Sequence, residues 1–212
     1  MSTVLLTAFE PFDGQSVNAS LEAVRRVEAA WDGPATLAVR VLPVSFRRAR
    51  QELRAAVAEL APVVVVCAGE AGGRAAVGVE RVAVNVIDAR IPDADGSAPV
   101  DVPVIAGAPA AFFSTLPVKA CWTAAREAGA PAEVSGTAGT YVCNATFYAL
   151  QHLLHGRAGV RSGFVHVPRL PEQVGVGEPA LEVDVAARGL LAVLRAALAT
   201  TTDVRVAAGS LG

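Results

Sequence analysis

Apolar and polar positions along the chain follow strand and helix periodicities in turn. Short apolar or β-rich runs predict strands over residues 4–9, 36–44, 63–66, 132–135 and 163–167. Apolar residues at helical spacing predict helices over residues 21–30, 46–60, 117–128, 141–155 and 179–198. Repeated β–α units in one chain predict a single domain over residues 1–212. Its expected fold class is α/β, a three-layer α/β/α sandwich with a mixed, mostly parallel sheet.

Two segments depart from this pattern. Residues 77–87 alternate in polarity, with Glu80 and Asn85 among valines, which indicates an antiparallel or site-forming segment. Residues 92–107 are rich in Pro, Gly and Asp and predict a long loop. A subunit arm, a lid and a plain surface loop are all compatible with that composition.

Composition and charge exclude several classes of protein. Hydrophobic residues make up 53% of the 212 and charged residues 18%, the opposite of a disordered chain. No apolar run reaches the ~18 residues of a membrane span, so no membrane partner is expected. The 18 basic and 20 acidic residues lack the electrostatic footprint of a nucleic-acid binder.

The N-terminus and the cysteines favour a cytoplasmic protein. The first residues lack a basic region and Glu10 and Pro11 soon interrupt the apolar run, so no signal peptide is expected. Three cysteines, Cys67, Cys121 and Cys143, cannot all pair within one chain. Each is therefore a buried apolar residue or a working thiol.

The glycine-rich segment at 68–73 follows the all-valine strand and predicts a tight turn near a ligand site. It has neither the spacing of a dinucleotide fingerprint nor the ending of a P-loop. Glu70 within it would also repel a phosphate. A nucleotide site is therefore not favoured here.

Cys143 stands where a nucleophilic cysteine belongs. A strand ends near Ser135, small residues turn, and Cys143 enters the first turn of the next helix, with Thr140 as the expected N-cap. Amides at a helix N-terminus favour a thiolate and can hold an oxyanion. By contrast, Cys67 in a valine strand and Cys121 inside a helix are typical of buried apolar residues.

The sequence indicates less clearly which residues would serve Cys143 as a base and as the acid that orients this base. His152 and His155 lie two to three turns along the helix from Cys143, too far to reach it, and are expected to be exposed or to cap the helix. His166 is at the end of a strand, where α/β folds build sites. Glu80 among valines is either an orienting carboxylate or, as composition alone favours, a solvent-facing side chain.

Four sequence blocks, in order, are similar to one known family. They are residues 6–12 (LTAFEPF) with 17–20 (VNAS), 80–93 (ERVAVNVIDARIPD), 138–144 (AGTYVCN), and 163–168 (GFVHVP) with 170–173 (LPEQ). Together they resemble pyroglutamyl-peptidase I, also called pyrrolidone-carboxylate peptidase, a family of cysteine peptidases.

This resemblance implies an activity and a catalytic set. The family removes N-terminal pyroglutamate from peptides through a thioester acyl-enzyme. It has a phosphorylase-like α/β/α fold, uses no cofactor or metal, and often forms a homo-oligomer, a tetramer. The resemblance implies Cys143 as nucleophile, His166 as general base and acid, and Glu80 as orienter. Arg90 would help to hold or polarise the reacting carbonyl.

The resemblance also implies the lactam pocket. Its residues would be Phe9, Phe12, Asn18, Glu70, Ile91, Tyr141 and Val142. Two positions depart from the family pattern. Glu70 replaces the usual Gln and can only accept hydrogen bonds when ionised. Arg169 stands where an aromatic residue is common. Glu70 could make lactam binding weaker or pH-dependent.

Two further hypotheses come from other classes of protein. A non-catalytic relative would bind pyroglutamyl peptides or lactam metabolites, and Glu70 is the feature that supports it. A nucleoside phosphorylase-like transferase would share the architecture, but the chain has no convincing phosphate clamp.

Overall fold

The computed structural model describes residues 2–209, and strands alternate with helices as the periodicity predicts, except that four strands follow one another between residues 64 and 113. The strands are β1 (Thr3–Phe9), β2 (Thr36–Leu42), β3 (Val64–Ala71), β4 (Val77–Glu80), β5 (Val82–Val84), β6 (Ala111–Phe113), β7 (Ala132–Ser135) and β8 (Arg161–Pro168). The helices are α1 (Ala19–Ala30), α2 (Arg48–Leu60), α3 (Val118–Glu127), α4 (Val142–Leu154) and α5 (Val183–Ala199), with a 3-10 turn at Pro171–Gln173.

One six-stranded sheet forms the centre of the structure, in the order β2-β1-β3-β8-β4-β7. Neighbouring strands are parallel except for β4 and β8, which pair antiparallel. β5 and β6 make a separate antiparallel pair. The mixed, mostly parallel sheet and the antiparallel segment near residue 80 are therefore confirmed.

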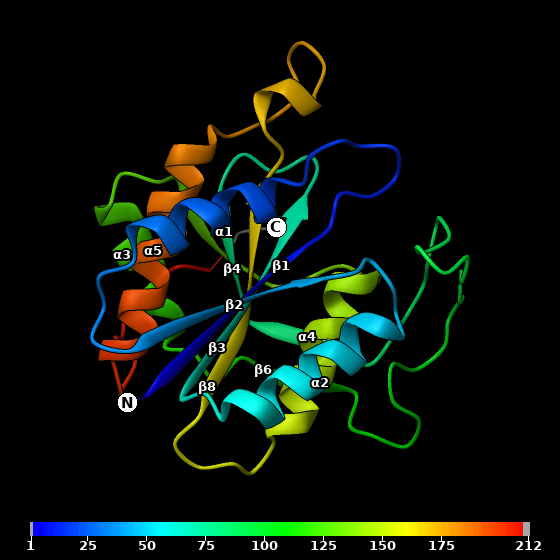
Figure 1. The fold of residues 1–212 in the computed structure, drawn as a ribbon, viewed down its shortest axis with the longest axis horizontal. Helices are drawn as coiled ribbons and strands as arrows, with labels where there is room; N and C mark the ends of the chain where they lie inside the picture. The colour runs from blue at the N-terminus through cyan, green and yellow to red at the C-terminus, as the bar shows by residue number, and fades with distance from the viewer. Residues whose placement is uncertain (1, 210–212) are drawn as a thin grey trace.

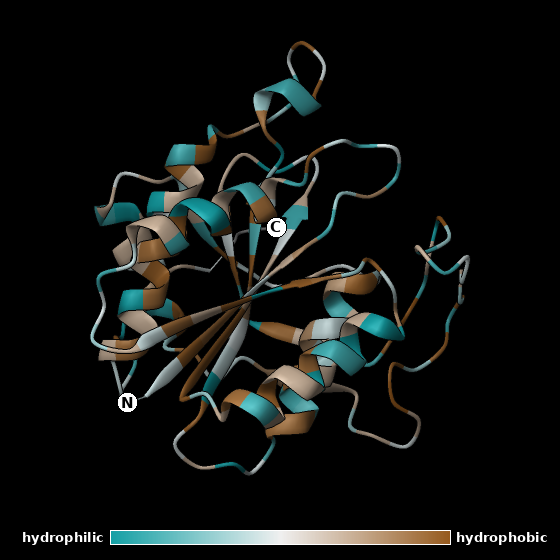
Figure 2. Cartoon of the chain, in the orientation of Figure 1, coloured by the Kyte–Doolittle hydropathy of each residue, from teal (hydrophilic) through white to brown (hydrophobic). Residues whose placement is uncertain are grey.

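Helices cover both faces of this sheet and complete the three layers. α1, α3 and α5 pack on one face, and α2 and α4 pack on the other (Figure 1). β1 shows how the sequence builds both cores: Val4 and Leu6 face α1 and α5, whereas Leu5 and Phe9 face α2 and α4. The hydropathy colouring shows the same division, with apolar strands inside and polar positions on the outer helix surfaces (Figure 2). Each such buried side chain stabilises the fold by roughly 1.5–3 kcal/mol.

Helix starts differ from the sequence prediction because side chains find other partners. α4 begins after Tyr141 with no side-chain cap, so the expected Thr140 cap is wrong. The Thr140 hydroxyl instead donates to the Asp88 carbonyl at 2.8 Å. The N-cap of α1 is Asn18, whose Oδ1 accepts from the Ser20 amide at 2.9 Å. These bonds tie two helix starts to the loops at the same edge of the sheet.

The predicted glycine turn at 68–73 is mostly strand. β3 continues to Ala71 because β8 pairs with it along its length, as far as Ala71 opposite Pro168. Only Gly73 in that segment has the positive φ, +78°, that a turn demands of glycine. Gly69 and Glu70 are consequently held in the sheet rather than in a loop.

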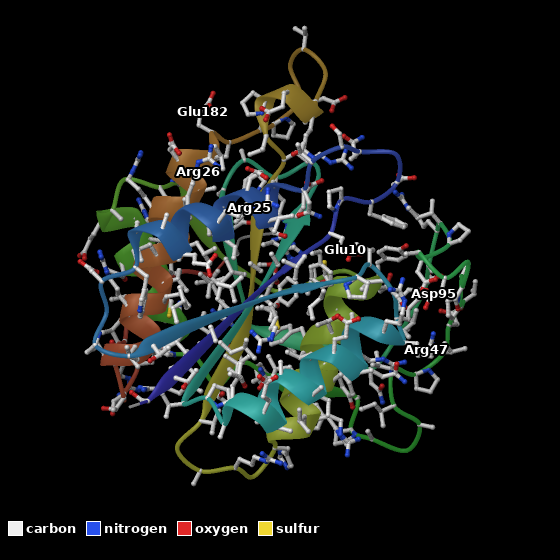
Figure 3. The ribbon with its side chains drawn as sticks, in the orientation of Figure 1. Glu10, Arg25, Arg26, Arg47, Asp95 and Glu182 are labelled. Atoms are coloured by element: carbon white, nitrogen blue, oxygen red, sulfur yellow. The ribbon has the colours of Figure 1, made fainter. Side chains whose placement is uncertain are left out.

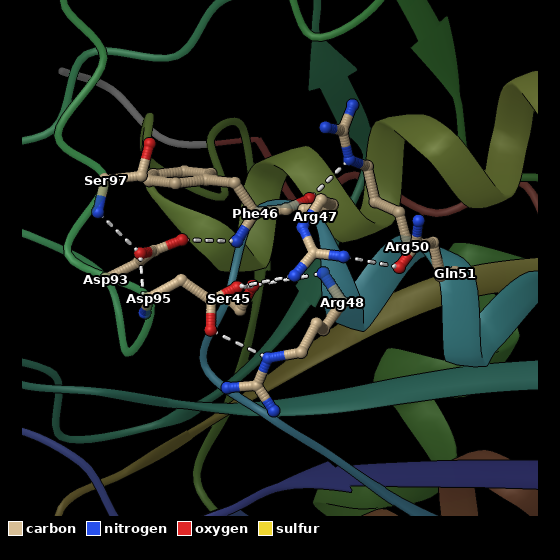
Figure 4. Close-up of polar contacts among 9 residues, drawn as sticks. All are labelled: Ser45, Phe46, Arg47, Arg48, Arg50, Gln51, Asp93, Asp95 and Ser97. Carbon is tan, nitrogen blue, oxygen red and sulfur yellow. Dashed lines mark hydrogen bonds and ion pairs between the residues drawn. The ribbon is translucent and has the colours of Figure 1, made fainter.

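The 92–107 loop is anchored to the start of α2. The Asp93 carboxylate accepts from the amides of Phe46 at 2.8 Å and Ser97 at 2.9 Å. Asp95 accepts from the Ser45 hydroxyl at 2.7 Å and from Arg48 Nε at 2.8 Å (Figure 4). Asp95 also lies beside Arg47 of the same turn (Figure 3). These contacts fix the first residues of the 92–107 loop, which directly follow Ile91.

In the part of the chain that the structure describes, residues 2–209, no helix has the length and apolar character needed to cross a bilayer.

Candidate active site

Glu80, Cys143 and His166 come from three elements that meet at one edge of the main sheet. Glu80 ends β4, His166 lies in β8, and Cys143 is the second residue of α4. β4 and β8 are neighbours, with Gly78 opposite His166 in their register. Topology thus brings Glu80 into one site with Cys143, 63 positions later in the sequence, and with His166.

Glu80 points inward and contacts His166. Its Oε1 lies 2.8 Å from His166 Nδ1, and the side chains are 0% and 4% exposed. The expectation from composition that Glu80 faces solvent is therefore wrong. A buried carboxylate is stable when it is paired, and the same Oε1 accepts from Arg74 Nη1 at 2.9 Å.

Sequence reasoning missed Arg74, which precedes β4. Besides Glu80, its guanidinium donates through Nη2 to the Thr137 carbonyl at 2.9 Å. A Cβ at Gly78 would lie 2.5 Å from Arg74 Nη1, so glycine is needed there for the arginine to cross the strand. A lone arginine after a glycine pair carries no signal in the sequence, because only the fold shows its partners.

The sulfur of Cys143 sits directly over β3. A Cβ at Gly69 would lie 2.8 Å from Cys143 Sγ and 2.8 Å from the Phe164 ring. Gly69 is paired with His166 in the strand register, and the Phe164 and His166 ring centroids are 4.8 Å apart. Cys143 and His166 therefore share Gly69 and Phe164 as neighbours.

Within residues 2–209 the Cys143 thiol makes no hydrogen bond, including none to His166. Such catalytic hydrogen bonds often tighten only when substrate is bound.

Asn144 locks the start of α4 in place. Its Oδ1 accepts from the Val84 amide at 3.0 Å, and its Nδ2 donates to the carbonyls of Val84 at 2.9 Å and Val86 at 3.0 Å. The side chain is fully buried. These bonds fix the residue next to Cys143 to β5, which gives the nucleophile a rigid support.

Burial dominates the electrostatics of the nucleophile. Enclosure of the sulfur raises the pKa of Cys143 to about 12, the negative charge of Glu80 adds to the rise, and Arg74 opposes it. The expected stabilisation of a thiolate by the helix N-terminus is thus outweighed. This pKa favours a neutral thiol at pH 7 in the unliganded protein, so attack by this sulfur would require a base that takes its proton.

The other cysteines and histidines lie where the sequence predicts. Cys67 and Cys121 are fully buried, and burial raises the pKa of each to about 12. His152 and His155 are exposed at the end of α4, where their rings pack against Phe112.

A cavity of about 190 Å³ opens beside Cys143. That is below the ~300–1,000 Å³ of sites for drug-sized ligands, so it suits one small ring. All seven residues predicted for the lactam pocket line it: Phe9, Phe12, Asn18, Glu70, Ile91, Tyr141 and Val142. Sequence reasoning missed Asp13, Gln15, Val17 and Val44, and noted Arg169 only as a departure.

Aromatic contacts shape the wall of this cavity. The Tyr141 ring lies 6.2 Å from Phe12 and packs edge-on against Phe46 at 5.2 Å, measured between centroids. The Tyr141 hydroxyl donates to the Pro92 carbonyl at 2.9 Å, at the start of the 92–107 loop. The apolar wall is therefore supported from the segment just before α2 and from that loop.

The Glu70 carboxylate is held by protein donors. Its Oε2 accepts from the Ala19 amide at 2.8 Å and from Gln173 Nε2 at 2.9 Å. Its Oε1 accepts from Arg169 Nε at 3.1 Å. The two departures from the family pattern, Glu70 and Arg169, are thus one ion pair at the first turn of α1, where a negative charge is favoured.

The structure does not bring Arg90 into the cavity. Arg90 is exposed and makes no hydrogen bond within the described residues, although its neighbour Ile91 lines the wall. No cluster of three or more potential metal ligands occurs among residues 2–209. The chemistry available on this geometry is nucleophilic attack by a thiol, with a histidine and a buried acid beside it.

Known proteins are similar to this chain over nearly its full length. A family profile described as pyroglutamyl peptidase matches residues 2–200. A pyrrolidone-carboxylate peptidase of Clavibacter michiganensis is 54% identical over 212 residues and covers 100% of both chains. One from Pseudomonas fluorescens is 50% identical over 213 residues, again with 100% of both covered.

Solved structures also resemble this chain over nearly its full length. The crystal structure of pyroglutamyl peptidase I from Bacillus amyloliquefaciens has a TM-score of 0.93 at 38% identity, over 97% of this chain and 99% of that one. The pyrrolidone carboxyl peptidase of Thermococcus litoralis has a TM-score of 0.92 at 35% identity, over 98% and 100%. The predicted α/β fold class is confirmed by these neighbours and by the sheet.

Proposed function

The chain belongs to the pyroglutamyl peptidase family and is a peptidase that removes N-terminal pyroglutamate, and we propose that it does so with Cys143 as nucleophile, His166 as general base and acid, and Glu80 as orienter. The observation that carries this assignment is the hydrogen bond between Glu80 and His166 at the edge where the Cys143 sulfur sits. This arrangement is a nucleophile with a base that a third group orients.

The proposed reaction starts from the neutral thiol. His166 Nε2 takes the Cys143 proton while the sulfur attacks the pyroglutamyl carbonyl carbon, and Glu80 stabilises the imidazolium that forms. The resulting oxyanion is held by backbone amides. α4 has no side-chain cap, which leaves the amides of its first turn free for this role.

Collapse of the intermediate breaks the carbon–nitrogen bond. The imidazolium gives its proton to the leaving amine, and a thioester joins pyroglutamate to Cys143. His166 then takes a proton from water, whose oxygen attacks the thioester. The carbon–sulfur bond breaks and the imidazolium gives that proton to the departing sulfur, which restores the thiol. Pyroglutamate leaves as the acid, which releases its remaining proton to solvent.

The lactam ring fits the apolar cavity. We propose that Phe9, Phe12 and Tyr141 contact its faces and that Ile91 and Val142 close the wall, since all five line the cavity. An uncharged ring needs few polar partners. Both Glu70 oxygens already accept from protein donors, so its side chain serves the wall rather than the lactam. Arg90 stays a candidate for holding or polarising the reacting carbonyl, but its side chain would have to move into the cavity to do so.

A chromogenic pyroglutamyl substrate tests the assignment. Wild type should release pyroglutamate under reducing conditions, and Cys143→Ala should lose that activity entirely. Cys121→Ala is the matched control, because it removes a thiol that is buried against α5 and should keep wild-type turnover. Folded wild type without thiol-dependent release, or an active Cys143→Ala variant, would overturn the assignment.

We also propose that the enzyme is a cytoplasmic homo-oligomer, a tetramer as in the family it resembles. Exposed apolar side chains support this, notably Phe113 at 68% and Val100 at 63% exposed. The three free cysteines are compatible with a reducing compartment, which keeps thiols reduced. Light scattering at micromolar concentration checks the assembly, and fractionation of cells checks the location. A monomer, or protein outside the cytoplasm, would refute the corresponding statement.

A further inference from the structure

Arg74 connects three parts of the site that are far apart in sequence. It stands between β3 and β4, and its guanidinium donates to the Glu80 carboxylate and to the Thr137 carbonyl, both at 2.9 Å. Thr137 belongs to the loop that leads into α4 and Cys143. The arginine is itself largely buried, with 21% of its side chain exposed. It lies outside the substrate cavity, since it does not line it.

Glu80 needs this partner to carry its charge. The carboxylate is fully buried, Oε2 has no hydrogen-bond partner, and Oε1 is shared between His166 and Arg74. Removing a carboxylate from water is costly unless it meets an opposite charge. His166 is neutral whenever it acts as a base, so it cannot supply that charge. Arg74 can, because a guanidinium keeps its proton at all physiological pH values.

Arg74 also acts on the nucleophile. Burial and the charges of Glu80 and Glu70 raise the pKa of the Cys143 thiol, as does the neighbouring Cys67, and Arg74 is the cation that lowers it. The other charged group facing Arg74 is Glu133 of β7, whose Oε1 lies 3.6 Å from Nη1 and whose side chain is half exposed. Arg74 is therefore the cation that faces the carboxylates of Glu80 and Glu133 and that lowers the pKa of the Cys143 thiol.

We propose that Arg74 is a positioning residue for catalysis, which holds Glu80 ionised and directed at His166 and so sets the pH range in which His166 can accept the Cys143 proton. This inference rests on the proposed function of the triad. A purely structural role, as a clamp between the β3–β4 turn and the Thr137 loop, is the alternative that the experiment must separate.

Five variants make that separation: Arg74→Met, Arg74→Lys, Glu133→Gln, Glu80→Gln, and Arg74→Met combined with Glu80→Gln. We expect Arg74→Met to lower kcat about 10- to 100-fold, part of the ~10²–10⁴-fold that positioned proton transfer supplies. KM should change less than about two-fold because Arg74 does not line the cavity. Glu133→Gln should behave as wild type.

The pH profile of kcat/KM is the readout that a structural clamp would not move. Without Arg74, the buried Glu80 carboxylate is stabilised only while His166 holds a proton, so the pair should lose that proton at higher pH and the acid limb should move up by about one unit. Arg74→Lys keeps the charge and should restore the acid limb to its wild-type pH, while losing part of kcat with the Thr137 contact. The double variant should be no slower than Glu80→Gln alone, because Arg74 acts through Glu80.

The results distinguish failure of the Arg74 inference from failure of the proposed function. If Arg74→Met keeps the wild-type kcat and acid limb, or if its loss adds fully to that of Glu80→Gln, the inference is overturned. If Arg74→Met does not fold, the lysine and double variants answer the same questions, since neither leaves a buried carboxylate without a cation. An inactive wild type would instead refute the proposed function.

Discussion

Replacing Gly69 with alanine would put a methyl group against the sulfur of Cys143. The new Cβ would lie 2.8 Å from Sγ and 2.8 Å from the Phe164 ring. Non-bonded heavy atoms settle at ~3.5–4.0 Å, so the separation from each of the two neighbours must grow by about 0.7–1.2 Å. Gly69 is not in the left-handed region, so backbone strain plays no part.

The sulfur should move further than the Phe164 ring. Phe164 is fully buried and packs against the rings of Phe9, Phe147 and His166, with centroids 6.4, 5.9 and 4.8 Å away. Cys143 borders the open cavity and has room on that side. A displacement of about 1 Å at a reacting atom can cost ~10²-fold in rate. Overpacking should also lower the free energy of unfolding by about 1–3 kcal/mol.

The assay is kcat and KM on the chromogenic pyroglutamyl substrate, with urea unfolding in parallel. Gly69→Ala should lose about 100-fold in kcat, because the nucleophile is displaced. Gly136→Ala is the matched control: a Cβ there meets nothing within 4 Å, so activity should stay within about two-fold of wild type. A Gly69→Ala enzyme with wild-type kcat would refute the placement of the sulfur over β3.

The remaining predictions concern ionisation and the cavity wall. Burial raises the pKa of Cys143 to about 12, so its alkylation by iodoacetamide should keep accelerating through pH 9; a plateau below pH 8 would instead indicate a resting thiolate. Burial also raises the pKa of Cys67 and of Cys121 to about 12, above the value near 9 in the unfolded chain. Their contribution to the free energy of unfolding is therefore complete below pH 9 and is lost as the pH rises toward 12. The free energy of unfolding, measured from a single urea transition, should fall by about 1.4 kcal/mol per pH unit per thiol above pH 9. Cys121→Ala should make this dependence on pH less steep, and a free energy that does not change with pH would contradict the burial of the two thiols. Arg169→Ala should raise KM by at most about five-fold, since a partly exposed ion pair is worth about 1 kcal/mol, and Glu70→Gln in addition should recover part of it; additive losses would argue against coupling of the pair.

Local pattern was sufficient for the elements and for the nucleophile. The periodicities of residues 4–9 and 141–155 depend on neighbours in sequence, and β1 and α4 form close to those bounds. The small residues before Cys143 placed it at a helix start by the same local logic. Helix starts were less predictable, because Thr140 reaches 52 positions back to Asp88 rather than capping its own helix.

Glu80 marks the limit of composition as a guide. A carboxylate among valines is solvent-facing by default, and only the antiparallel pairing of β4 with β8 turns it toward His166. Its burial also needs Arg74, which no pattern in the sequence connects with it. The four-block resemblance implied Glu80 as the orienting acid, but it could not show what stabilises the negative charge of Glu80.

The sequence alone thus determined the alternation of strands and helices, the family, and the small apolar character of the pocket, because these depend on periodicity and on residues in short blocks. The tertiary structure alone decided which charges face one another. Glu70 meets Arg169 across 99 positions and Glu80 meets His166 across 86. Electrostatic energy depends on distance in space and on burial, and both are created only when distant strands pair.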